Sequence, residues 1–189
     1  SRRTSKLLIL INGAYGRRLA EIAQRLGRSC TLWETPEDRP IDAAELDRRL
    51  AADPSLGQVA AIHCETTSGI LNPLADLAAV CAEHGRGLLV DAMSTFGALP
   101  IDAPALPIEA LMASSNKCLE GVPGIGFVIA RASALRKAEG RSPSLSFDLH
   151  AQWRGFESNG QWRFTPPVQV LAALDAALRQ HTAEGGVAG

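Results

Sequence analysis

The chain has 189 residues, of which 46% are hydrophobic, and its formal net charge at pH 7 is −1. This length and composition suit one large domain with a sizeable core, and the balanced charge excludes the basic surface that nucleic-acid binding requires. No apolar run approaches the ~18–20 residues of a membrane-spanning helix, so we expect neither nucleic acid nor a membrane as a partner.

Apolar runs alternate with amphipathic segments along the chain, beginning with "KLLILIN" at residues 6–12. Short apolar runs predict buried strands, and the segments between them carry helical start and stop signals. In residues 17–27, the residues Leu19, Ile22, Ala23 and Leu26 recur at helical spacing and predict a buried helical face. We expect strands at residues 6–12, 30–34, 58–65, 87–93, 110–117 and 124–130, and helices at residues 17–27, 42–53, 73–85 and 167–186.

The order of these elements predicts an α/β fold, because strands that alternate with helices form parallel sheets. Only a short glycine-rich turn joins the last two strands, whereas a parallel crossover takes about a dozen residues or more. We therefore predict a mainly parallel six-stranded sheet with one antiparallel strand and helices on both faces. Residues 132–166 are turn-rich, and we expect a loop layer that its aromatic side chains pack onto the domain.

The four cysteines form no CxxC pair, and their spacing predicts no disulfide framework. We interpret them as reduced thiols, which indicates a cytoplasmic protein. The stretch His63-Cys64-Glu65 contains the H-x-E half of a zinc deaminase signature, but the P-C-x-x-C half is absent. We therefore expect no metal.

Polar side chains follow several predicted strands at their carboxyl ends, where open α/β sheets bind ligands. Asp91 and Lys117 end two successive strands. They could form a structural ion pair, or a flat ligand could lie between them. The carboxylate would hold a protonated ring nitrogen and the amine an aldehyde carbon, a layout that pyridoxal phosphate has. Tyr15 is placed to stack on the ring, and a hydroxyl between Thr66 and Ser68 to bind the phenolic oxygen.

Each of these residues by itself also fits a structural role. An aspartate after an apolar strand often only caps a loop, a lysine at a strand end is usually solvated, and a lone tyrosine usually packs. The stretch "GVPGIG" at residues 121–126 opens a strand, whereas a dinucleotide-binding loop must open a helix. We therefore interpret it as a turn with close backbone packing.

Six stretches resemble the class V pyridoxal-phosphate aminotransferases, and within them the 2-aminoethylphosphonate–pyruvate aminotransferases. The stretches are "LINGAYGRR", "IHCETTSGILNP", "VDAMSTFGALPID", "SSNKCLEGVPGIGFVIA", "SLSFDLHAQW" and "WRFTPP". They occur in order over about residues 6–186, and "HCETTSG" and "SSNKCLEGVPG" are specific to this branch. The resemblance implies the large domain of the fold type I aminotransferases. It also implies transfer of an amino group from 2-aminoethylphosphonate to pyruvate, giving phosphonoacetaldehyde and alanine.

The resemblance also assigns roles to the residues at the strand ends. Lys117 resembles the lysine that forms the internal aldimine with pyridoxal 5'-phosphate and moves the proton during catalysis. Asp91 resembles the partner of the pyridine nitrogen, and Tyr15 the aromatic residue that stacks on the ring. Thr66 matches the hydroxyl near the phenolic oxygen, with Ser68 as a close rival.

Two further residues enter only through the resemblance. Asn116 stands where relatives often place a phosphate contact. Thr165 resembles a phosphate contact that is donated across a dimer interface, so the resemblance implies a homodimer in which each site needs two chains.

The family also has segments that these 189 residues do not contain. Its Ser-Gly-Thr phosphate loop precedes the equivalent of Lys6, and its carboxy-terminal small domain carries an arginine for the substrate carboxylate. We therefore expect residues 1–189 to be a partial large domain, in which the last strand lacks an outer neighbour. Two alternatives stay open: another class V aminotransferase of the alanine– or serine–glyoxylate type, or a non-catalytic remnant of the fold.

Overall fold

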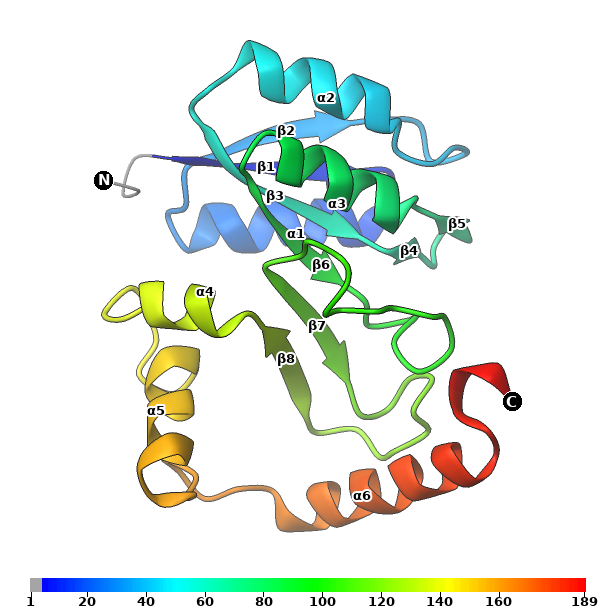
Figure 1. Ribbon diagram of the computed structural model, residues 1–189, viewed down its shortest axis with the longest axis vertical. Helices are drawn as coiled ribbons and strands as arrows, with labels where there is room; N and C mark the ends of the chain where they lie inside the picture. Colours follow the sequence, from blue (N-terminus) through cyan, green and yellow to red (C-terminus); the bar gives the residue numbers. More distant parts are fainter. Residues whose placement is uncertain (1–4) are drawn as a thin grey trace.

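Six strands form the central sheet of the chain, for which a computed structural model describes residues 5–189 (Figure 1). In chain order the strands are β1 (Lys6–Ile11), β2 (Cys30–Glu34), β3 (Leu56–Ile62), β6 (Gly87–Asp91), β7 (Ala110–Ser114) and β8 (Gly126–Ala130). Their order in the sheet is β2-β1-β3-β6-β7-β8. All neighbours are parallel except β7 and β8, which are antiparallel. This confirms the predicted mixed sheet and leaves β8 at its edge.

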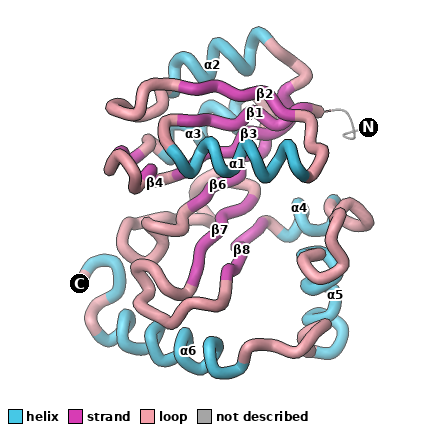
Figure 2. Tube along the Cα trace, turned by 180° about the vertical axis from the view of Figure 1, so that it is seen from behind, coloured by secondary structure: helices cyan, strands magenta, loops and turns pink. Residues whose placement is uncertain are grey.

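Helices cover both faces of the sheet, as predicted. Helix α1 (Ala14–Arg25) lies on one face, and α2 (Ala43–Ala52) and α3 (Leu74–Glu83) lie on the other (Figures 1 and 2). Successive side chains of a strand point to opposite faces, and β1 shows both contacts. Its odd-numbered residues from Leu7 to Ile11 pack with α1, and Leu8 and Leu10 join the cluster under α2 and α3.

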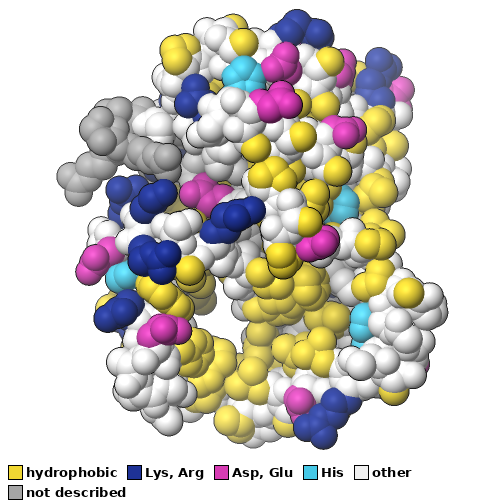
Figure 3. Space-filling view, in the orientation of Figure 1, with side chains coloured by type: hydrophobic (Ala, Val, Ile, Leu, Met, Phe, Trp, Pro, Cys, Tyr) yellow, Lys and Arg dark blue, Asp and Glu magenta, His cyan; other side chains and the backbone are white. Residues whose placement is uncertain are grey.

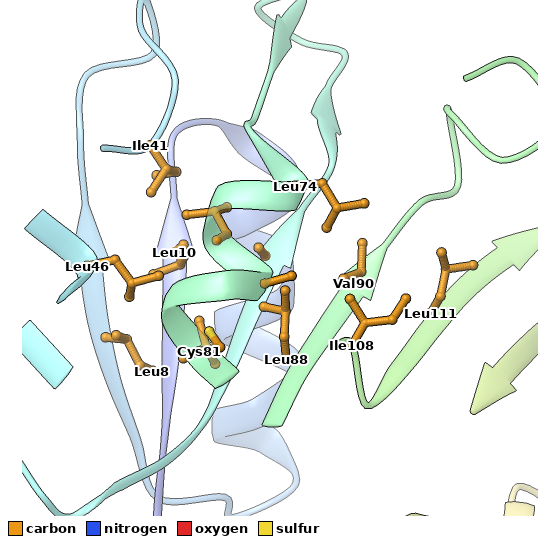
Figure 4. Packing of buried hydrophobic residues seen from close by; sticks show 14 of the residues in the cluster. Leu8, Leu10, Ile41, Leu46, Leu74, Cys81, Leu88, Val90, Ile108 and Leu111 are labelled. Carbon is orange, nitrogen blue, oxygen red and sulfur yellow. The ribbon is translucent and has the colours of Figure 1, made fainter. Parts of the chain in front are cut away.

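The larger hydrophobic cluster lies between the sheet and the pair α2–α3 (Figure 4). Leu46 of α2, Leu77 of α3 and Leu88 of β6 are all at most 1% exposed. Cys81 lies in the same cluster, and burial raises the pKa of its thiol to about 12. A thiol with that pKa stays neutral at physiological pH, so Cys81 acts as a small core side chain.

The buried face of α1 differs from the prediction. Ile22 is 48% exposed and Leu26 is 60% exposed, so the expected apolar face is wrong at these positions. The residues of α1 that are buried are small: Gly16, Ala20 and Ala23, of which Ala23 belongs to the predicted face. A Cβ atom on Gly16 would lie only 3.0 Å from the Cα of Ile11. The helix packs so close to β1 that only small residues fit between them.

Several predicted boundaries also shift at the polar strand ends. Strand β7 ends at Ser114, three residues before Lys117, so Lys117 lies in the turn that follows the strand. Helix α1 begins at Ala14 instead of residue 17, which places Tyr15 on its first turn. Strand β3 ends at Ile62, and a separate hairpin follows, made of β4 (Cys64–Glu65) and β5 (Ile70–Leu71). Residues 66–69 form the turn of this hairpin.

The carboxy-terminal third of the described chain forms an arm of helices. The arm consists of α4 (Ala132–Lys137), α5 (Leu149–Asn159), α6 (Val168–Ala183) and the short 3₁₀ helix η2 (Gly186–Ala188). None of these helices contains a buried residue. Figure 3 shows an opening between the arm and the rest of the molecule, with hydrophobic side chains along its edge.

Residues 132–166 therefore differ from the expected loop layer, since two helices occupy much of the segment. The rings of Phe156 and Trp162 meet edge to face, with centroids 5.3 Å apart, but both stay about 40% exposed. These aromatic residues pair with each other instead of packing into the sheet. Among the helices of residues 5–189, none has the length and hydropathy needed to span a bilayer.

Candidate active site

The carboxyl ends of β1, β3, β6 and β7 lie along one edge of the sheet, because these neighbouring strands are all parallel. We call the segments that follow them, residues 12–16, 63–69, 91–97 and 115–121, the rim. Ligands of open α/β sheets bind at such an edge. The rim is therefore the place to look for chemistry in this chain.

The turn that carries Lys117 is fixed by the residue at its start, Ser115, which is fully buried. The Ser115 hydroxyl donates to the carbonyl oxygen of Val122 at 2.7 Å, and its own carbonyl accepts the N–H of Gly121 at 2.8 Å. Lys117 is exposed, and within residues 5–189 its amine forms no ion pair. The backbone is thus held in place while the amine remains available to a ligand.

Gly121→Ala is expected to disturb this turn, because a Cβ atom at Gly121 would lie 2.7 Å from the carbonyl oxygen of Ser115. Such overpacking costs about 1–3 kcal/mol of folding free energy. Urea unfolding should therefore show a lower midpoint for this variant. Gly126→Ala is the matched control, because its nearest atom would be 3.7 Å away. Equal midpoints for the two variants would contradict the prediction.

Asp91 is the last residue of β6, and only one of its two carboxylate oxygens accepts a hydrogen bond within residues 5–189. Its Oδ1 accepts the N–H of Met93 at 2.9 Å, and Oδ2 accepts no hydrogen bond from any residue between 5 and 189. Burial is the main cause that raises the pKa of Asp91; the bond from Met93 lowers it, and the nearby Glu65 carboxylate raises it. A half-buried carboxylate with one free oxygen is suited to a cationic N–H donor.

The raised pKa of Asp91 predicts a pH-dependent cost to the fold. Below the unfolded-state pKa of 3.8 the carboxyl is protonated in both states and costs nothing. As the pH rises past that value, the Asp91 carboxyl loses its proton more readily in the unfolded chain than in the folded chain. The free energy of unfolding therefore falls. Asp91→Asn keeps an oxygen for Met93 and should therefore raise the melting temperature of the free chain at pH 7. Thermal unfolding at pH 3 should show no such gain, and a gain of the same size at both pH values would refute this account.

Tyr15 lies on the first turn of α1 with a partly exposed ring. The Arg18 guanidinium sits 4.9 Å from the ring centroid. The backbone N–H of Tyr15 donates to Oε1 of Glu65 at 3.0 Å, which ties the start of α1 to the β4–β5 hairpin. The ring is therefore placed at the rim by its backbone, on a regular helix.

A series of hydrogen bonds joins the separate segments of the rim. The Cys118 thiol donates to the carbonyl oxygen of Ser94 at 3.3 Å, and the Ser94 hydroxyl donates to the carbonyl oxygen of Cys64 at 3.2 Å. Glu65, the next residue, extends this series by accepting the backbone N–H of Tyr15. These contacts connect the turns of Lys117, Asp91 and Thr66 with the start of α1. Sequence patterns did not point to Ser94 or to this role of Glu65. The one available signal was a glutamate within an otherwise uncharged polar stretch.

The remaining predicted residues divide into two groups. Thr66 and Asn116 are exposed on the rim, and within residues 5–189 their side chains form no hydrogen bond, whereas the Ser68 hydroxyl donates to the carbonyl oxygen of Glu65 at 3.3 Å. Thr165 lies apart, on the exposed connection between α5 and α6. It lines a hollow of about 810 Å³ together with neighbours in residues 161–166 and with no rim residue. The structure thus brings together every predicted residue except Thr165.

The H-x-E stretch plays a structural part. Nδ1 of His63 lies 2.9 Å from Oγ1 of Thr95, and burial lowers the pKa of the imidazole, so it is neutral at pH 7. Across residues 5–189, no three His, Cys, Asp or Glu side chains gather closely enough to hold a metal ion.

Comparison with known proteins gives one family. The family model described as aminotransferase class-V matches residues 9–188. The 2-aminoethylphosphonate–pyruvate transaminase of Pseudomonas putida (strain W619) is 59% identical over 185 residues, which are 98% of this chain and 50% of the relative. A second such transaminase, from Burkholderia lata, is 54% identical over 186 residues with the same coverage. The chain spans about half the length of the curated relatives it matches.

Solved structures have the same fold over nearly all of this chain. The pyridoxamine–pyruvate aminotransferase from Mesorhizobium loti superposes with a TM-score of 0.88 at 29% identity, covering 96% of this chain and 47% of that one. The alanine–glyoxylate aminotransferase from Nostoc sp. superposes with a TM-score of 0.85 at 27% identity, covering 95% and 48%.

Proposed function

The chain belongs to the class V aminotransferases, a family of pyridoxal-phosphate-dependent enzymes, and from this premise we propose that it transfers the amino group of 2-aminoethylphosphonate to pyruvate. The products would be phosphonoacetaldehyde and alanine. One observation carries the proposal: a free lysine amine and a carboxylate with a free oxygen share one rim, in a chain 59% identical to a transaminase of that name.

The rim residues fit pyridoxal 5'-phosphate by their chemistry. Lys117 offers an exposed amine for the aldehyde, and Oδ2 of Asp91 is free to accept the ring N–H. The half-buried Tyr15 ring offers an aromatic face beside them. When bound, the cofactor supplies an electron sink for the negative charge that develops on the substrate carbon.

The protein side chains then have separable roles. The Asp91 carboxylate keeps the ring nitrogen protonated, because a nearby negative charge favours the cationic form. The Lys117 amine would serve as the base that takes and returns the proton at the substrate carbon. Thr66 is favoured over Ser68 for the phenolic oxygen, since the Ser68 hydroxyl is already used by the backbone of Glu65.

The phosphate group of the cofactor needs a binding site other than the start of α1. Helix N-termini commonly bind phosphate through free N–H groups. Here the N–H groups of Tyr15 and Gly16 already donate to the Glu65 carboxylate, at 3.0 and 3.1 Å. We propose Asn116 from the rim as one phosphate contact.

We further propose that residues 1–189 act as one partial large domain, with residues 132–166 inside it, and that the chain works as a homodimer. Thr165 supports the dimer, because it is exposed and shares no hollow with the rim of its own chain, so that a second chain could receive it. The cysteines of the described chain are free, which favours a reducing compartment, and we propose the cytoplasm.

The test is amino transfer by the full chain supplied with pyridoxal phosphate. We expect alanine to form from pyruvate only when 2-aminoethylphosphonate is present, with phosphonoacetaldehyde in equal amount. A second arm offers alanine or serine with glyoxylate, and glycine formed there in place of the first reaction would identify the glyoxylate type. Formation of neither product, with no cofactor bound, would identify a non-catalytic member of the fold.

A further inference from the structure

Glu65 is a fully buried carboxylate that the proposed chemistry leaves without a task. Its Oε1 accepts the N–H of Tyr15 at 3.0 Å and the hydroxyl of Thr67 at 3.2 Å. Its Oε2 accepts the N–H of Gly16 at 3.1 Å. Within residues 5–189 no lysine, arginine or histidine pairs with it, so backbone N–H groups, one hydroxyl and the dipole of α1 hold its charge.

The contacts of Glu65 differ from those of an ordinary helix cap. Helix α2 is capped by Asp42, a residue directly before it, whose carboxylate accepts from Ala44 and Glu45. Glu65 instead comes from a different element, the β4–β5 hairpin, and loses all contact with water. Burying a carboxylate is unfavourable unless its hydrogen bonds are complete. The structure meets this condition at the turn that carries Tyr15.

The backbone also makes room for this side chain. A Cβ atom at Gly13 would lie 2.1 Å from Cγ and 2.5 Å from Cδ of Glu65, so only glycine fits before α1. The Thr67 hydroxyl completes the contact, since it also accepts the N–H of Ala14 at 3.4 Å. Glu65 thereby joins the first turn of α1 to the hairpin turn that contains Thr66.

We propose that Glu65 is a positioning residue: its carboxylate locks the first turn of α1 against the β4–β5 hairpin, so that the Tyr15 ring and the Thr66 hydroxyl keep a fixed spacing around the cofactor ring. The inference rests on the proposed function, because the ring-stacking role of Tyr15 belongs to it. Glu65 itself touches neither cofactor nor substrate. It acts through the backbone of Tyr15.

The first experiment needs no cofactor, because Tyr15 is the single tyrosine of the chain. Incorporation of 3-fluorotyrosine gives one ¹⁹F resonance that reports the surroundings of this ring. Glu65→Gln replaces one acceptor oxygen by an NH₂ group that faces an N–H donor, so we expect a shifted or broadened resonance. The control Asp42→Ala removes the side-chain cap of α2 and should leave the resonance unchanged.

The second experiment measures cofactor affinity as a double-mutant cycle with Tyr15→Leu. Pyridoxal phosphate is titrated by its visible absorbance, and stability is followed by urea unfolding. We expect Glu65→Gln to weaken affinity about tenfold in the parent chain, a factor equal to ~1.4 kcal/mol, and by less than about twofold in the Tyr15→Leu chain. Asp42→Ala should lower stability and leave affinity unchanged.

The outcomes separate this inference from the proposed function. Equal affinity losses with and without Tyr15, or an unchanged ¹⁹F resonance, would overturn the positioning role. If the parent chain develops no lysine-dependent absorbance, the proposed function fails and the ¹⁹F comparison alone decides the positioning of the ring. If Glu65→Gln does not fold, Thr67→Val replaces it, because it removes one hydrogen bond to Oε1 and should shift the same resonance by a smaller amount.

Discussion

Lys117→Ala is expected to abolish the visible absorbance band that the chain develops with pyridoxal phosphate. The band requires a covalent link between an amine and the cofactor aldehyde, and Lys117 is the amine at the rim. Asp91 and Tyr15 would remain, so the variant should still bind the cofactor, but reversibly and without the band. The measurement is an absorbance titration of parent and variant, and amino transfer should be lost with the band.

The other lysines provide the control, because aldehydes react weakly with any exposed amine. Lys6 lies at the opposite end of β1 and pairs with Asp53 at 3.9 Å, and Lys137 lies on α4. Lys6→Ala and Lys137→Ala should keep the full band. A band of equal strength in all three variants would mean that the reaction is non-specific, and the assignment of Lys117 would be wrong.

Asn72→Ala is expected to lower the free energy of unfolding by about 3–5 kcal/mol. The substitution leaves several buried polar groups without hydrogen-bond partners, and each such group costs ~1–3 kcal/mol. Asn72 is 2% exposed, and all its hydrogen-bonding capacity is used. Its Nδ2 donates to the carbonyl oxygen of Ile62 and to Oδ1 of Asn12. Its Oδ1 accepts from Nδ2 of Asn12 and from the N–H of Ile41.

This network joins the ends of β1 and β3, so its loss should also loosen the rim. Urea unfolding measures the cost as a lower midpoint. Asn159→Ala is the matched control, because Asn159 is exposed and accepts one bond from the N–H of Gln161. We expect that control to change stability by no more than about 0.5–1 kcal/mol. Similar midpoints for the two variants would show that the buried network contributes little.

Both predictions concern the same edge of the sheet. They distinguish a residue that acts on the cofactor from a residue that stabilises the fold. Lys117 is exposed on a fixed turn and should matter for the cofactor far more than for stability. Asn72 is buried below the rim and should matter for stability first. A catalytic group needs access to its ligand, whereas the residues that hold its backbone need burial and complete hydrogen bonding.

The sequence by itself determined the fold class and the positions of most strands. Short apolar runs such as "KLLILI" and "GLLVD" can be buried on both faces only inside a covered sheet, so their pattern fixes the architecture. The short turn between β7 and β8 similarly forced the antiparallel strand. The likeness to solved aminotransferases over about half their length agrees with the large-domain fold that the resemblance implied. The roles of Lys117, Asp91 and Tyr15 remain predictions, although the structure places all three at one rim.

Only the tertiary structure decided which contacts hold that rim together. Glu65 reaches the start of α1 across 50 residues of sequence, and Asn72 reaches Asn12 across 60. Local periodicity carries no information about such pairs, because each depends on how two separate segments pack. The same limit explains α1, where close approach to β1 selected Gly16, Ala20 and Ala23 for burial and left Ile22 exposed. Hydrophobicity predicts which segments become buried, and the distance between packed elements decides which side chains fit.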